Sequence, residues 1–458
     1  MRDQALSFAI SRQAAQLDEL KQLLSIPSIS AQPEHKGDVA RAAQWLADHL
    51  RAMGMQRAQV MPTSGHPVVY SEWLGAGANK PTLLVYGHYD VQPVDPLDLW
   101  QSDPFKPEVR GQNIYARGAS DDKGQLYVHV KAVEAYLKTS GKLPVNVKFV
   151  LEGEEEVGSP SLDPFIEANR QLLAADAVLI SDGSMPRPDL PALTYGLRGI
   201  CYMEVKITGP KRDLHSGSFG GAVYNPIQAL SEIIISMKDA RGHVTLPGFY
   251  DRVRPIDDEE RRSLAKAPFD EAAFLSEAGI PSTWGEKGYT VLEQICARPT
   301  LECNGIWGGY MSEGSKTVLP SAASAKISMR LVPDQDPKEI AELFRAHVKR
   351  VAPPHVQVTV KDLHGGKPAM VDRNSSVMQA AATALERAFD QRPVLTREGG
   401  SIPVVSTFQS VLGIPTVLMG LGLPDDNLHS PNEKLHLPNF YRGIQASIHF
   451  LDEWSQRR

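Results

Sequence analysis

The chain has 458 residues, 42% of them hydrophobic, and a formal net charge of −6 from 48 Lys and Arg against 54 Asp and Glu. This length suggests two or three domains with room for a hydrophobic core. There is no run of basic residues, no apolar stretch long enough to cross a membrane, and no CxxC motif, which argues against a nucleic-acid binder, a membrane protein and a disulfide-built module. We expect a cytoplasmic protein whose three thiols, Cys201, Cys296 and Cys303, are buried.

The first part of the chain predicts strands and helices in alternation. Apolar residues at helical spacing favour a helix over 39–53, with Asp38 placed to cap its start and Gly54 its end. Short apolar runs predict buried strands at 82–86, 145–151 and 177–180, with a helix at 125–137 between the first two. Largely apolar strands interleaved with helices are typical of an α/β sheet covered on both faces.

The middle of the chain changes character and predicts a second, smaller unit. Alternating residues favour half-buried strands at 200–208 and 325–331, with further strands at 299–306 and 356–360. Helices are expected from Asn225, an N-cap followed by Pro226, to about residue 237, and over 340–351. The resulting order βαββαβ is that of a ferredoxin-like domain.

Pro- and Gly-rich stretches bracket this unit, and a helix (377–388) and a strand (416–419) follow it. We therefore expect one α/β catalytic domain built from residues 1–196 and 367–458, with a domain of residues 197–366 inserted into it. The charged stretch 241–290 is interpreted as an elaboration of the inserted domain.

Residue types that bind metals gather in five short segments, four of which we place at the ends of predicted strands and the fifth in a loop near the end of the sequence. Each segment alone has a structural explanation, such as a capped turn, a favoured helix start or a solvated acidic face. Together they are harder to explain, because adjacent carboxylates at the mouth of a sheet are costly without a compensating cation. The residues are His88 and Asp90; Asp121 and Asp122; Glu154, Glu155 and Glu156; Asp182; and His429.

This donor set indicates hydrolysis assisted by two metal ions. Imidazole and carboxylate without thiolate suit zinc, manganese or cobalt better than a structural Cys-rich zinc site. Two metals about 3.5–4 Å apart can lower the pKa of a shared water and polarise a carbonyl, while a carboxylate that binds no metal acts as general base. The sequence shows no G-x-S-x-G elbow, complete dinucleotide fingerprint or P-loop, which argues against serine hydrolase and nucleotide-dependent chemistry.

Four segments of the sequence resemble those of a known family. Residues 84–93 (LVYGHYDVQP) and 117–124 (RGASDDKG) are similar to the metal segments of the dinuclear zinc peptidases and amidohydrolases, which include carnosinase, cytosolic nonspecific dipeptidase, aminoacylase and glutamate carboxypeptidase. Residues 316–320 (KTVLP) and 397–403 (REGGSIP) resemble most the carnosinase and nonspecific dipeptidase branch. The resemblance covers essentially the whole chain and implies a zinc-peptidase-like α/β catalytic domain with an inserted ferredoxin-like lid and dimerisation domain.

The resemblance also implies roles for single residues at the metal centre. His88 and Asp182 would hold one divalent ion, Glu156 and His429 the other, and Asp121 would bridge both. Zinc is the metal expected first, with manganese as the alternative. Glu155 would be the general base, Asp90 would orient His88, and a cis peptide bond would follow Asp121. Glu154 departs from the pattern, either disturbing the pKa of Glu155 or facing solvent.

For the inserted domain, the resemblance implies a lid and a homodimer contact. His215 would reach the partner subunit's active site and stabilise the oxyanion, and Arg330 would hold the substrate carboxylate. His364, Thr317 and Ser401 would be further substrate contacts, although His364 could instead be a loop hinge and Thr317 a turn residue.

Three functional hypotheses follow from these observations. The first is a homodimeric dinuclear metallopeptidase that cleaves dipeptides or short peptides. The second is an amidohydrolase of N-acyl or N-carbamoyl amino acids, or a carboxypeptidase. The third is a binding protein that has lost catalysis, against which the complete ligand set and Glu155 argue.

Overall fold

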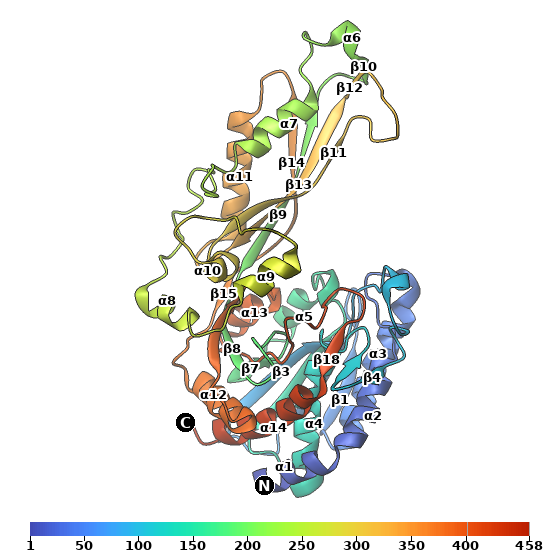
Figure 1. Ribbon diagram of the computed structural model, residues 1–458. Helices are drawn as coiled ribbons and strands as arrows, with labels where there is room; N and C mark the ends of the chain where they lie inside the picture. Colours follow the sequence, from blue (N-terminus) through green and yellow to red (C-terminus); the bar gives the residue numbers. More distant parts are fainter. Residues whose placement is uncertain (401, 458) are drawn as a thin grey trace.

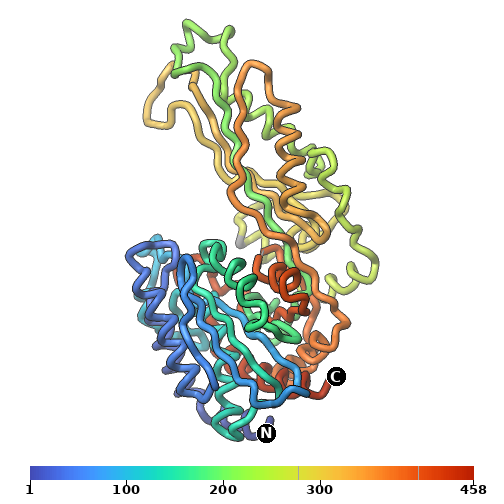
Figure 2. The backbone as a smooth tube through the Cα atoms, turned by 180° about the vertical axis from the view of Figure 1, so that it is seen from behind, coloured from blue at the N-terminus to red at the C-terminus, as the bar shows by residue number. Residues whose placement is uncertain are grey.

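The computed structural model describes residues 1–400 and 402–457 and shows a large body from which a smaller, elongated one projects (Figure 1). The large body is a mixed sheet covered by helices, and the projecting one is a four-stranded sheet with two helices. The predicted fold class, an α/β fold with an inserted ferredoxin-like unit, is confirmed. Seen from behind, both chain ends lie on the part of the molecule away from the projecting body (Figure 2).

A nine-stranded sheet runs through the large body in the order β1-β2-β6-β3-β7-β17-β8-β15, with β16 paired to β8. Its four central strands, β6, β3, β7 and β17, are parallel, so their carboxyl ends share one edge. The strands are β1 (Arg57–Met61), β2 (Val68–Trp73), β3 (Thr82–His88), β6 (Asn146–Glu152), β7 (Ala177–Ile180), β8 (Ala192–Leu197), β15 (Ala369–Met370), β16 (Val394–Glu398) and β17 (Thr416–Leu418).

Alternate side chains of these strands pack against helices on opposite faces, as the apolar runs predict. Leu83 and Val85 of β3 belong to the main core, whereas Leu84 and Tyr86 belong to a second core on the other face. The first face is covered by α1 (Arg2–Ser11), α2 (Gln13–Leu24), α3 (Lys36–Met53), α4 (Lys123–Ser140), α12 (Ser376–Phe389) and α14 (Leu437–Trp454), and the second by α5 (Leu162–Ala168) and α13 (Pro403–Thr407).

The projecting body has its own core and the expected order of elements. Its antiparallel sheet has the order β11-β13-β9-β14, which is the strand order of a ferredoxin-like domain. Val205, Ile327 and Phe344 lie in its separate core between the sheet and the two helices. The elements are β9 (Gly199–Thr208), α7 (Pro226–Ile235), β11 (Thr300–Gly308), β13 (Ala322–Leu331), α11 (Pro337–Val351) and β14 (Gln357–Gly366).

Two segments elaborate this body at its opposite ends. At the far end, β10 (Leu214–His215) pairs with β12 (Val318–Leu319) beside α6 (Ser216–Phe219) (Figure 1). At the near end, the stretch between α7 and β11 forms α8 (Asp258–Leu264), α9 (Glu271–Ala278) and α10 (Val291–Cys296). Leu264 and Cys296 belong to the main core, so this stretch packs on the large body rather than only elaborating the inserted one.

Two further details differ from the sequence predictions. The helix that contains Val39 begins at Lys36 and is preceded by His35; Asp38 lies inside its first turn and contacts the His35 ring at 2.7 Å instead of acting as the N-cap. Cys303 is exposed, because it lies on the outer strand β11, whereas Cys201 and Cys296 are buried as expected.

A three-stranded sheet of β4 (Glu108–Arg110), β5 (Asn113–Tyr115) and β18 (Lys434–His436) completes the fold. Within the described residues, no helix combines the length and the apolar character needed to span a bilayer.

Candidate metal centre

Three of the predicted site segments follow the parallel central strands of the large sheet. His88 is the last residue of β3, Glu155 and Glu156 form a short helical turn just after β6, and Asp182 follows β7. Because these strands are parallel neighbours, their carboxyl ends deliver the side chains to one edge of the sheet. The continuous apolar runs that form the strands thus also position the polar residues after them.

The other two segments come from loops that converge on the same edge. Asp121 does not end a strand as predicted but lies in the loop between β5 and α4, and the peptide bond between it and Asp122 is cis, as the resemblance implies. His429 lies in the loop before β18 and has a positive φ of 58°. That loop is tied down by Asn432, whose side chain accepts a hydrogen bond from the Gln101 N–H and donates one to the Leu99 carbonyl.

Together these residues form two donor groups that share Asp121. The His88 Nε2 lies 3.1 Å from one Asp121 oxygen, and the His429 Nε2 lies 2.9 Å from the other. Asp182 completes the first group and Glu156 the second, and in each group the donor atoms all lie within 4.8 Å of one another. The five residues predicted as ligands are therefore brought together in the predicted partition.

Hydrogen bonds behind the donors fix their orientation. The His88 Nδ1 lies 3.1 Å from the Asp90 carbonyl oxygen and 3.5 Å from its carboxylate, which leaves Nε2 to face Asp121. The same carboxylate accepts the backbone N–H groups of Glu155 and Glu156 at 3.2 and 3.1 Å. Asp90 therefore positions two segments of the centre, one more than the sequence predicted.

Glu433 holds the loop of Asp121 and was missed as a site residue by sequence reasoning. Its buried carboxylate accepts backbone N–H groups from Gly118, Ser120 and Asp121, at 2.9 to 3.0 Å, and the Arg117 guanidinium at 2.8 Å. The only sign of this role in the sequence is that Glu433 is a carboxylate four residues after His429.

Gln92 is a second contact that the sequence left without a role. Its side-chain amide donates a hydrogen bond to the Glu156 carboxylate at 2.8 Å. The same Glu156 oxygen lies 3.3 Å from the His429 Nε2, so Gln92 helps to hold the carboxylate next to His429.

Electrostatics at the centre favour a bound cation. Burial raises the pKa of Asp182 to about 7, with a further rise from the charge of Asp121. Burial likewise raises the pKa of Glu155 well above its usual value, and the nearby charges of Asp182 and Glu156 add to the rise. Hydrogen bonds to Asp121 and Glu156 raise the pKa of His429 to about 10. Carboxylates crowded together in this way are chemically suited to divalent ions, which would compensate their charge.

Glu154 is structural, and neither of the two roles considered for it from the sequence applies. Its buried side chain accepts the backbone N–H of His66 at 2.7 Å and that of Ser161 at 3.1 Å, so it joins two loops beside the centre. It therefore does not face solvent, and Glu155 owes its raised pKa to burial and to other carboxylates.

Two of the predicted substrate contacts lie together on the open face of the inserted sheet. Arg330 on β13 and His364 on β14 flank β9, opposite Ile200 and Tyr202 respectively, on the face away from the core under α7 and α11. The His364 ring packs edge-on against Tyr202. Because β14 extends to Gly366, His364 is a strand residue after a bulge and not a loop hinge.

Two other predicted contacts, His215 and Thr317, are not brought to the centre of their own chain. His215 and Thr317 lie side by side at the far end of the inserted body, where the Ser216 N–H donates to the Thr317 carbonyl (Figure 1). His215 is exposed, and its Nδ1 accepts the Gly217 N–H at 3.1 Å, so a neutral ring carries its proton on Nε2. Ser401 lies outside the described residues.

Comparison with known proteins identifies the family to which this centre belongs. Residues 84–453 match the sequence profile described as Peptidase family M20/M25/M40. The chain belongs to this family. It is therefore a metal-dependent peptidase by family, in agreement with the two donor groups and with the resemblance read from the sequence.

Individual relatives agree with the carnosinase and dipeptidase branch. The chain is 34% identical to a Cys-Gly metallodipeptidase of Candida albicans over 94% of this chain and 92% of the relative, and 32% identical to the human Beta-Ala-His dipeptidase over 95% and 89%. Among solved structures, a metallo-carboxypeptidase of Sulfolobus solfataricus, Sso-CP2, shares 34% identity with a TM-score of 0.87, over 96% of this chain and 99% of that one.

Proposed function

We propose that this M20-family enzyme hydrolyses dipeptides, with two divalent metal ions and Glu155 as general base. The observation that carries the proposal is the position of Asp121 between two complete donor groups, with the half-buried Glu155 directly before Glu156 of the second group. Relatives named as dipeptidases, which match nearly the whole chain, support the choice of substrate.

The metal ligands would be His88 and Asp182 for one ion, Glu156 and His429 for the other, and Asp121 for both. Two ions bound there would supply Lewis-acid chemistry, polarising the scissile carbonyl and lowering the pKa of the attacking water. We propose zinc as the first choice, with manganese as the alternative, because the donors are imidazole and carboxylate only.

Glu155 would move the protons of the reaction. It would take a proton from the attacking water and deliver it to the nitrogen of the leaving amine. Asp90, which accepts the Glu155 backbone N–H, would hold the base and His88 in a fixed relation.

The inserted domain, residues 197–366, would act as a lid that recognises substrate and joins two subunits. Arg330 would bind the substrate carboxylate, with His364, Thr317 and Ser401 as further contacts. His215 lies far from its own centre and carries a proton on Nε2 when neutral, which suits donation to an oxyanion in the partner subunit. The outer strand β11 exposes Ile306 and Trp307, which supports a homodimer formed through this domain.

We further propose a cytoplasmic location, without nucleic-acid or membrane partners. All three cysteines are free thiols, and that of Cys303 is exposed, which a reducing compartment permits.

The second candidate function is that of a carboxypeptidase or of a deacylase of N-acyl or N-carbamoyl amino acids. The similarity to Sso-CP2 favours the carboxypeptidase form. All of these substrates have a free carboxylate for Arg330, and only the dipeptide also has a free amine close to the scissile bond.

A substrate panel separates these functions. The enzyme, loaded with zinc or with manganese, would be assayed on Cys-Gly, β-Ala-His, a pentapeptide, and N-acetyl and N-carbamoyl amino acids. We expect the dipeptides to have the highest kcat/KM, by at least tenfold. Inactivity on every dipeptide, with turnover of the pentapeptide or of an acylated amino acid, would overturn the proposal and assign the second function.

A further inference from the structure

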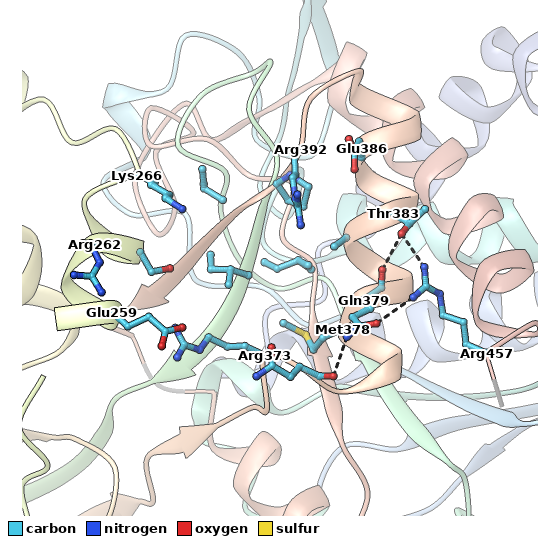
Figure 3. Close-up of a pocket in the computed structure, with 17 residues that line it drawn as sticks. Glu259, Arg262, Lys266, Arg373, Met378, Gln379, Thr383, Glu386, Arg392 and Arg457 are labelled. Carbon is cyan, nitrogen blue, oxygen red and sulfur yellow. Dashed lines mark hydrogen bonds between the residues drawn. The ribbon is translucent and has the colours of Figure 1, made fainter. Parts of the chain in front are cut away.

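A second site lies on the large body, away from the metal centre. It is a cavity of about 900 Å³ between α8 and α12, beside β16 (Figure 3). None of its lining residues belongs to either donor group of the metal centre. The cavity therefore needs an explanation other than the peptidase reaction.

Cationic side chains from four separate segments converge on this cavity. Five cationic residues and two acids, Glu259 and Glu386, line it, so its charge is positive on a chain whose net charge is −6. Figure 3 shows Lys266 and Arg457 on opposite sides of the cavity, with Arg392 between them. The cations are Arg262 and Lys266, on α8 and just after it, Arg373 before α12, Arg392 before β16, and Arg457 near the chain end.

The cations differ in how far they are already neutralised. Arg457 donates hydrogen bonds to Gln379 and Thr383 and forms a salt bridge of 3.8 Å with Glu453, and Arg373 lies over the Tyr195 ring. In contrast, across residues 1–400 and 402–457 neither Lys266 nor Arg392 forms a salt bridge, so their charges are available to a ligand. Arginine guanidinium groups bind phosphate oxygens in a forked geometry, and lysine adds a point charge.

The inner wall of the cavity is apolar. Ala382, Val394 and Leu395 are partly exposed on this wall, and Leu193 and Met378, which also line it, are almost fully buried. A basic rim over an apolar wall suits a ligand with a charged end and an apolar or planar body, rather than a free inorganic anion.

The walls of the cavity are held in place by the protein itself. Glu260 of α8 forms a salt bridge of 2.8 Å with Arg397 of β16 and accepts a hydrogen bond of 2.9 Å from the Tyr195 hydroxyl. Leu264 anchors the same helix in the main core. The site is thus preformed, which lowers the free-energy cost of binding.

We propose that this cavity binds a small organic polyphosphate, a molecule with two or more phosphate groups on an apolar or planar body. The phosphates lie among Lys266, Arg392 and Arg457, and the body packs on Ala382, Val394 and Leu395.

Binding of ATP, inorganic pyrophosphate and adenosine to the metal-loaded enzyme, measured by equilibrium dialysis, tests this proposal. The variant Lys266→Ala/Arg392→Ala removes two cations that lie on different walls of the cavity, on the α8 side and before β16. Its matched control is Lys142→Ala/Arg170→Ala, which removes the same charge at two exposed positions elsewhere. Metal content is measured in every sample, so that chelation at the catalytic centre is recognised.

We expect ATP to bind wild-type enzyme and the control alike, and the cavity variant at least tenfold more weakly. We also expect pyrophosphate to bind several-fold more weakly than ATP, and adenosine not to bind. Equal ATP affinity in the cavity variant and wild type, or no ATP binding at all, would overturn the proposal. Pyrophosphate that binds as tightly as ATP would show that the apolar wall contributes nothing to binding. Adenosine that binds as tightly as ATP would show that the cationic residues contribute nothing. Either result would contradict the assigned ligand class.

Discussion

Single residues behind the candidate metal ligands decide whether the donor groups keep their geometry. Asp90 and Glu433 have no place among the five predicted ligands, yet each accepts backbone N–H groups from the segments that carry them. Partners of this kind are often as important to metal affinity as the ligands themselves. Glu433 is the more informative of the two, because it contacts the loop of Asp121 and follows the loop of His429.

The variant Glu433→Gln tests this role. It keeps the shape of the side chain but turns an amide N–H₂ toward backbone donors, so at least one hydrogen bond is lost and the Asp121 loop shifts. We expect metal affinity to fall by about 10–100-fold, measured by titration of the metal-free protein. Glu167→Gln, on the exposed side of α5, is the control. Wild-type metal affinity in the Glu433 variant would show that the carboxylate is not needed to hold the loop.

At the scale of elements, α4 is tied to the sheet and to α14 by a buried histidine. The two ring nitrogens of His129 lie 2.8 Å from the Ser181 hydroxyl and 3.1 Å from that of Ser447. Burial lowers the pKa of His129 to about 3. In the unfolded chain the same imidazole binds a proton below about pH 6.5. Between about pH 6.5 and pH 3 the unfolded state therefore binds one proton more than the folded state, and the free energy of unfolding falls as the pH decreases.

The variant His129→Gln removes this titration. It destabilises the protein at pH 7.5, but its free energy of unfolding falls less steeply with acid than that of wild type, by up to about 1.4 kcal/mol per pH unit. The gap between the two proteins is therefore expected to narrow from pH 7 to pH 5. Urea unfolding in the presence of a chelator measures it, with the exposed His355→Gln as control. A constant gap would contradict the neutral, buried state of His129.

Elements with a strong local pattern were predictable from the sequence, and elements defined by their neighbours were not. Burial could be predicted directly from the residue pattern in five strands. These are β3, β6 and β7, which are largely apolar runs, and β9 and β13, in which apolar and polar residues alternate. β16 is only partly buried along its whole length, and α1 shows two buried alanines, so neither has a clear periodicity. The ligands were recognisable by residue type, whereas the role of Glu433 depends on N–H groups more than 300 positions away in the chain.

At the scale of the whole molecule, His215 lies far from the metal centre of its own chain. In the proposed dimer it would instead complete the centre of the partner subunit. If each lid completes the partner's centre, two inactive variants can restore each other. In a mixed dimer of His215→Ala and Glu155→Gln subunits, the centre of the first keeps its base and receives an intact histidine from the second.

Mixing these two variants is expected to restore about a quarter of wild-type activity, since random exchange gives half mixed dimers with one complete centre each. Subunits with different tags show that mixed dimers form. A mixture of Glu155→Gln with Asp121→Asn is the control, because both changes damage a subunit's own centre and no complete centre results. Mixed dimers without restored activity would refute the role of His215 in the partner subunit.

We propose Glu155 as the general base of a two-metal peptidase. The most direct test of this role measures the turnover of Cys-Gly by the Glu155→Gln variant, together with the metal content of the variant per subunit. Glu155 is not among the donors of either group, so the variant is expected to retain two metal ions. Loss of the base should lower kcat by about 10²–10⁴-fold or more. A variant that keeps both metals and cleaves the dipeptide within a few-fold of the wild-type rate would contradict the account.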